Sequence, residues 1–198
     1  MYLVENYFSS ISINDYVLNY RDVSRFILYC KECRQYRNCW SCPPFDFDIE
    51  EYIRKYEWVY IIGTKITLSD EVRALCSDVE DSKEMGAKII ADARKIIDPV
   101  LLKIEKSELG CRSFFAGTCH ICSLDECTRI KGIPCKYPDK IRPSLESFGF
   151  DIGKTTEKLL GIDLKWSDNG LLPEYLTLVS GIFSNAEFLD VEKYFLEK

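Results

Sequence analysis

The sequence lacks several features that would place it in a common functional class. Its 198 residues contain no apolar run near the ~20 residues that a membrane-spanning helix needs. A formal net charge of -6 disfavours nucleic acid or an anionic membrane as the main partner. The first residues lack the basic region and the small-residue cleavage site of a signal peptide, so we expect a cytoplasmic protein.

Catalytic signatures are scarce as well. The chain has no glycine-rich nucleotide-binding loop and no G-x-S-x-G motif, which gives no support to nucleotide binding or to a hydrolase. His120 is the only histidine, so a Cys–His nucleophile pair would have one candidate base. Because neighbouring residues on a turn rarely serve one site together, we expect His120 to be a surface imidazole rather than a ligand beside Cys119.

Cysteine, in contrast, is abundant, with ten in the chain. In a secreted protein they would indicate a disulfide framework, but in a reducing cytoplasm closely spaced pairs more often bind metal or do redox chemistry. Eight of the ten form two compact groups, and we predict that these eight are metal ligands: Cys30, Cys33, Cys39 and Cys42 in the first group, and Cys119, Cys122, Cys127 and Cys135 in the second. The other two, Cys76 and Cys111, are expected to be structural thiols.

The spacing within each group bears on the metal. The first group is separated by two, five and two residues and ends in Cys42-Pro43, and the second is separated by two, four and seven. Zinc ribbons place roughly 15–20 residues between their C-x-x-C units, whereas bacterial ferredoxin runs are this compact and end in Cys-Pro. The pattern favours iron–sulfur clusters, one or two of the 4Fe–4S type, and zinc remains the alternative.

Apolar periodicity predicts an α+β fold, with a small, mainly antiparallel sheet covered by helices and carrying two cysteine-rich metal-binding loops. Aromatic and β-branched residues predict strands at 58–64 and 174–183. The clearest helix lies within 82–109, where Pro99 should kink it or divide it. Nothing repeats and no low-complexity linker splits the chain, so we expect one domain over residues 1–198.

Weaker patterns complete the predicted fold. The first thirty residues indicate a short strand and then a helix through 23–29 that delivers Cys30 at its end. Asp48 is a candidate helix N-cap, with Glu51 as its capping-box partner. We expect a strand at 111–117, a helix around 156–160 that ends at Gly161, and a terminal helix near 186–196.

Two longer motifs surround the cysteine groups. The first joins Cys30-x-x-Cys33 to Tyr36 and to the run from Trp40 to Pro44, and the second joins residues 116–127 to 134–135 and 143–149. Together they resemble the signatures of the DUF2284 family of predicted metal-binding proteins, over about residues 30–152. The resemblance implies metal binding, prokaryotic occurrence and no assigned reaction, with these ligands: Cys30, Cys33, Cys42, Cys119, Cys122, Cys127 and Cys135. Cys39 departs from the family pattern, which leaves it either a fourth ligand or an addition beside a three-cysteine site.

Three functions are compatible with these patterns. The first is an iron–sulfur protein with two cysteine-ligated sites that serves electron transfer or redox chemistry for a protein partner. The second is a structural zinc protein that acts as a binding or interaction module. The third is an enzyme whose first cluster keeps an open iron position for a substrate, and the sequence names no catalytic residue for it.

Overall fold

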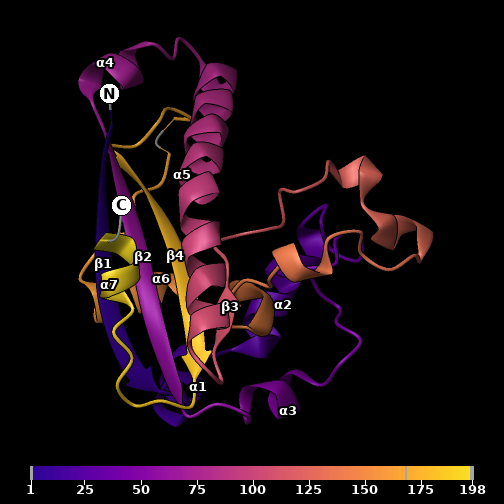
Figure 1. Ribbon diagram of the computed structural model, residues 1–198. Coiled ribbons are helices and arrows are strands. Elements are labelled where there is room, and N and C mark those ends of the chain that lie inside the picture. Colours follow the sequence, from indigo (N-terminus) through magenta and orange to yellow (C-terminus); the bar gives the residue numbers. More distant parts are fainter. Residues whose placement is uncertain (1, 168, 197–198) are drawn as a thin grey trace.

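The computed structural model describes residues 2–167 and 169–196, which form a four-stranded antiparallel sheet with helices on both faces (Figure 1). The strand order is β1-β2-β4-β3. The elements along the chain are β1 (Tyr2–Ser12), α1 (Ile13–Tyr20), α2 (Val23–Glu32), α3 (Ile49–Ile53), β2 (Trp58–Leu68), α4 (Asp70–Ala74), α5 (Val79–Ser107), β3 (Arg112–Phe114), η1 (Leu124–Glu126), η2 (Thr128–Lys131), η3 (Pro138–Lys140), η4 (Glu146–Phe148), α6 (Ile152–Leu160), β4 (Tyr175–Ser184) and α7 (Glu192–Leu196). Within the described residues, no helix is both long and apolar enough to cross a bilayer.

Strand β2 lies at the centre and pairs along its whole length with β1, from Trp58 opposite Ser12 to Leu68 opposite Tyr2. Successive side chains of a strand point to opposite faces, so a strand covered on both sides needs apolar residues throughout. The run from Trp58 to Ile62 meets that need, and alternate residues of β2 and β4 enter two separate cores.

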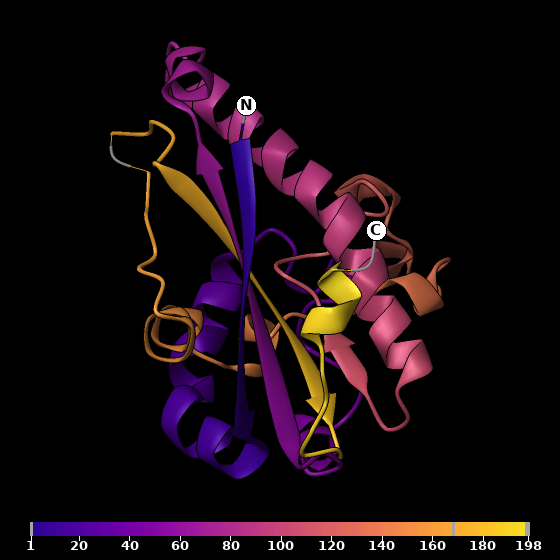
Figure 2. The same cartoon turned by 60° about the vertical axis from the view of Figure 1, so that its left-hand side comes forward.

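Helix α5 covers one face of the sheet, together with α7 (Figure 2). It starts at the N-cap Asp78, whose carboxylate accepts hydrogen bonds from the amides of Glu80 and Asp81. Its buried stripe packs against β2 and β4 through Ile89, Ala93, Ile97, Leu101 and Ile104.

The opposite face is aromatic and lies under α1 and α6. Tyr16 stacks on Phe150 with ring centroids 4.3 Å apart, and its hydroxyl is 3.0 Å from the hydroxyl of Thr155 on α6. Gly63 of β2 lets α6 approach closely, because a Cβ there would lie 2.5 Å from Leu160 Cδ1.

The structure confirms the α+β class and most of the predicted elements. Asp48 caps α3 by accepting a hydrogen bond from the amide of Glu51, and α6 ends at Gly161 in the left-handed conformation. Helix α2 carries Cys30 in its last turn, as expected. Of the two outcomes expected for Pro99, a division of the long helix does not occur, because α5 runs unbroken from Val79 to Ser107. Proline has no amide proton, so residue 99 cannot donate the helical hydrogen bond to the carbonyl of Lys95. Both Pro99 and Lys95 lie on the exposed side of α5, where water can bond that carbonyl instead.

Three predicted boundaries are also wrong, for local reasons. The first strand is eleven residues long and is followed by a further helix, α1. Strand β3 stops at Phe114, because the amide of Phe115 donates to the carbonyl of Pro143 instead of continuing the ladder. The terminal helix begins only at Glu192, because the preceding backbone bonds the hydroxyl of Tyr60 at Ala186 and Leu189.

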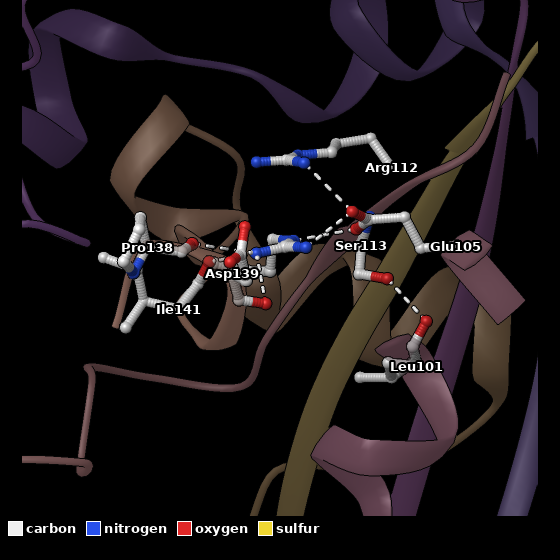
Figure 3. A network of polar contacts seen from close by, with 8 residues as sticks. Leu101, Glu105, Arg112, Ser113, Pro138, Asp139 and Ile141 are labelled. Atoms are coloured by element: carbon white, nitrogen blue, oxygen red, sulfur yellow. Dashed lines mark hydrogen bonds and ion pairs between the residues drawn. The ribbon is translucent and has the colours of Figure 1, made fainter. Parts of the chain in front are cut away.

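A buried charged network ties the segment after the second cysteine group to the sheet (Figure 3). Glu105 of α5 accepts hydrogen bonds from Arg142 at 2.6 and 2.8 Å, from Arg112 at 2.9 Å and from the amide of Ser113 at 2.9 Å. Arg142 also donates to the carbonyls of residues 138, 139 and 141. Burial alone would raise the pKa of Glu105, but these donors outweigh it and hold that pKa below its ordinary value.

Replacing Glu105 with glutamine should therefore lower the free energy of unfolding by about 3 kcal/mol, because Arg142 would stay buried without its charged partner. A lowered pKa in the folded state adds stability above the unfolded pKa of about 4.3, and that stability is lost as the pH falls through the folded pKa. Urea unfolding between pH 7 and pH 3 should show a smaller acid loss in E105Q than in the wild type.

The matched control is Glu157→Gln, which alters an exposed carboxylate on α6 and should change stability by less than about 0.5 kcal/mol. Equal stability of E105Q and E157Q would contradict the role given to Glu105.

Candidate metal centre

Both cysteine groups lie in segments on the same side of the molecule. Figure 1 shows the chain after α2 and the chain after β3 lying beyond α5, on the side away from β1. Cys30 is half-buried in the last turn of α2, and Cys33 is the exposed residue that ends this helix, with its amide bonded to the carbonyl of Cys30 at 3.1 Å.

The next two cysteines of the first group occupy one tight turn. Both Cys39 and Cys42 are buried, and the amide of Cys42 donates to the carbonyl of Cys39 at 3.1 Å. Between them, Ser41 is also buried, and its hydroxyl oxygen lies 3.3 Å from the sulfur of Cys39 and 3.9 Å from that of Cys42. The turn therefore directs two sulfur atoms and one hydroxyl to the same place.

Cys119, from the second group, joins this turn. Its amide donates to the hydroxyl of Ser41 at 3.1 Å. Hydrogen bonds from the thiols of Cys119 and Cys42 hold the pKa of Cys39 well below its ordinary value, and the same bonds raise the pKa values of Cys119 and Cys42.

The backbones of the two cysteine loops are held together by Trp40 and Arg129. The indole nitrogen of Trp40 donates to the hydroxyl of Thr128 and to the carbonyl of Ile133, both at 3.2 Å. Arg129 donates to the carbonyls of Cys39, Cys42 and Pro44, and its guanidinium lies 5.3 Å from the centre of the Trp40 ring. The two loops thus form one unit although about 80 residues separate them.

The remaining cysteines of the second group face one another around η1 and η2. Burial first, and then the nearby thiols of Cys127 and Cys135, raise the pKa of Cys122. The amide of Tyr137 donates to the sulfur of Cys135 at 3.3 Å. Cys119 therefore connects the two groups, because it contacts Cys39 and also lies near enough to Cys122 for that thiol to raise its pKa.

No three His, Cys, Asp or Glu side chains within residues 2–167 and 169–196 already stand in the arrangement of metal ligands. All ten cysteines are free thiols. The donor chemistry nevertheless suits a soft metal or an iron–sulfur cluster, because thiolate sulfur is the ligand such centres prefer.

The start of the second loop is fixed to α5. Arg94 donates to the carbonyl of Thr118 at 2.5 Å and pairs with Asp98 at 2.9 Å, and both side chains are buried. His120 is exposed, as predicted, and its Nε2 lies 3.4 Å from Asp98. Burial and the nearby Arg94 lower the pKa of His120. With Arg142 at the other end, both ends of this loop are tied to one rigid helix.

Sequence reasoning missed the residue on which the trio depends. Ser41 contacts three cysteines, and its position between two of them in the sequence is the only signal that could have identified it. The pairing of Arg129 with the first loop had no sequence signal beyond its charge.

A family model described as predicted metal-binding protein (DUF2284) matches residues 16–183, a range that contains both cysteine groups. No curated protein and no solved structure matches the chain.

Replacing Arg129 with alanine should free the turn that carries Cys39 and Cys42. The variant loses three hydrogen bonds from a charged donor, each worth about 1.5 kcal/mol or more. Amide hydrogen exchange over residues 38–44, followed by mass spectrometry, should become at least about tenfold faster.

Lys131→Ala is the matched control, since it removes an exposed cation from the same loop and should leave this exchange unchanged. If the R129A variant exchanged no faster than wild type, Arg129 would not be what joins the loops.

Proposed function

Because the chain belongs to the DUF2284 family of predicted metal-binding proteins, we propose that it is an iron–sulfur protein that exchanges electrons with a protein partner. The observation that carries this proposal is the meeting of Cys119 with Cys39 and Cys42 around Ser41. A 4Fe–4S cluster bound there would take up and release single electrons.

The ligands proposed for the first site are Cys39, Cys42 and Cys119, with a fourth from the end of α2. Cys30 and Cys33 line the same cavity as Cys42, so either can complete the set with a modest movement of that helix end. The compact spacing of these cysteines in the sequence favours a cluster over a single zinc ion.

The residues around the trio suit a redox centre. Arg129 places a positive charge beside the carbonyls of Cys39 and Cys42, which offsets the negative charge of a thiolate-ligated cluster. Ser41 can donate its hydroxyl proton to a ligating sulfur, and such hydrogen bonds raise the reduction potential. Cys33 is exposed, so a partner could approach the centre closely enough for electron transfer.

A structural argument supports metal binding at the second group, Cys122, Cys127 and Cys135. Neither η1 nor η2 contains a buried residue, so apolar burial contributes little to holding this segment in place. Bonds from a metal to three thiolates would supply the missing stability, as they do in small metal-dependent segments. For this group a closed zinc site is the second candidate.

Chemical analysis of anaerobically purified protein tests the identity of the metal. We expect brown protein that contains iron and acid-labile sulfide in equal amounts and absorbs broadly in the visible range. Colourless protein that holds zinc without iron or sulfide would refute the iron–sulfur proposal and support the zinc alternative.

Two serine variants test the proposed grouping of ligands. C119S should lose the metal of the first site, because it removes one of the three sulfurs at Ser41. The triple variant C122S/C127S/C135S should keep that metal and its visible spectrum. Cys76→Ser, outside both groups, is the matched control and should keep the full metal content. The proposed grouping of ligands would be overturned if the triple variant held no cluster while the C119S variant kept one.

A further inference from the structure

A cavity of about 1080 Å³ lies beside the cysteine trio. Its walls include residues of α2, α5 and η4 and residues from 164–167 and 170–177, and Cys30, Cys33 and Cys42 also line it. It follows α5 from Ser82 to Ile90, which is about 12 Å along the helix axis. Much of the lining is aliphatic or aromatic, including Phe26, Tyr29, Ile90, Trp166, Leu172 and Leu176.

Several polar atoms in this apolar lining lack a partner. Ser82 Oγ, Thr177 Oγ1 and Glu146 Oε2 are inaccessible to solvent and have no hydrogen-bond partner among the described residues. All three residues line the cavity, and Ser82 is only 3% exposed. Buried polar groups are normally satisfied, so unpaired ones that share a cavity indicate a missing partner.

The three atoms have compatible chemistry. Ser82 and Thr177 carry hydroxyl donors. Burial raises the pKa of Glu146, and its own amide and the hydroxyl of Ser144 oppose this only in part. The cavity therefore presents two hydroxyl donors, those of Ser82 and Thr177, to an acceptor.

The charges at the rim argue against a charged ligand. Arg25 lies 4.0 Å from Asp151, and Lys83 lies 3.6 Å from Glu80. Among the described residues, three cations line the cavity, and two of them, Arg25 and Lys83, are thus already matched by acids. The third, Lys165, is exposed to solvent, so the cavity offers no strong site for an anion.

We propose that this cavity binds an uncharged, largely apolar organic molecule, whose carbonyl-type acceptors are hydrogen-bonded by Ser82 and Thr177 and whose body lies against the aliphatic and aromatic lining of α2 and α5. This inference goes beyond metal binding and does not depend on which metal the cysteines hold. A molecule bound there lies within reach of the cysteine centre.

Nile red is a suitable probe, because it is uncharged, planar and aromatic, carries a carbonyl acceptor and does not alkylate thiols. The experiment is equilibrium dialysis of Nile red against the full chain as isolated, with bound dye extracted and quantified. We expect saturable binding of one dye per chain. Binding that never saturates, or no binding, would overturn the proposal.

Variants locate the binding site. Ala87 is an exposed residue of α5 that lines the cavity, and A87W should weaken binding at least about tenfold by filling it. Its neighbour Lys88 is exposed and does not line the cavity, so K88W should bind like the wild type. K83W blocks the same rim from a second exposed position and replaces A87W if that variant folds poorly. Equal binding by the blocking variants and K88W would contradict the proposal.

The double variant S82A/T177V tests the polar contacts. It should weaken Nile red binding by about five- to tenfold, because hydrogen bonds to the dye are lost. Its midpoint of urea unfolding should be unchanged or higher, because two unpaired buried hydroxyls are removed. Undiminished binding would show that these hydroxyls do not contact the ligand.

Discussion

The contact of Cys119 with the turn of Cys39 and Cys42 is the interaction on which the site depends. Ser41 makes it possible, because its hydroxyl accepts a hydrogen bond from the amide of Cys119 while it lies within reach of both other sulfurs. Three thiolates in contact would repel one another, and the hydrogen bonds that lower the pKa of Cys39 also raise the pKa values of Cys42 and Cys119. A metal centre is the partner that would allow all three to ionise together.

The scaffold keeps this contact in place through one helix. Helix α5 is fixed to the sheet by its apolar stripe, and it offers Arg94 to the start of the second cysteine loop and Glu105 to the residues after it. Arg94 pairs with Asp98, Glu105 pairs with Arg142, and all four side chains are largely buried. Separating either pair would leave a buried charge without its partner, which costs several kcal/mol. The second cysteine loop needs few buried apolar residues, because Arg94 and Glu105 hold its two ends. Trp40 and Arg129 attach its middle to the first loop.

Local patterns in the sequence predicted much of the fold. The apolar stripe of α5, the aliphatic run of β2 and the stop at Gly161 each follow from a few neighbouring residues, and the structure contains all three. Pro99 did not divide α5, because its cost depends on whether the freed carbonyl faces water. The site was harder to predict, since cysteine spacing grouped Cys119 only with Cys122, and it is tertiary packing that also brings it to Cys39 and Ser41. The cavity lined by Ser82 and Glu146 joins residues that are distant in sequence and had no local signal.

The central claim is that sulfur atoms from both cysteine groups share one inorganic centre. Anomalous diffraction at the iron edge, from crystals grown without air, tests it directly. The account predicts an iron peak bonded to the sulfurs of Cys39, Cys42 and Cys119. Iron bonded to Cys119 and Cys122 together, with no metal at Cys39 and Cys42, would contradict it.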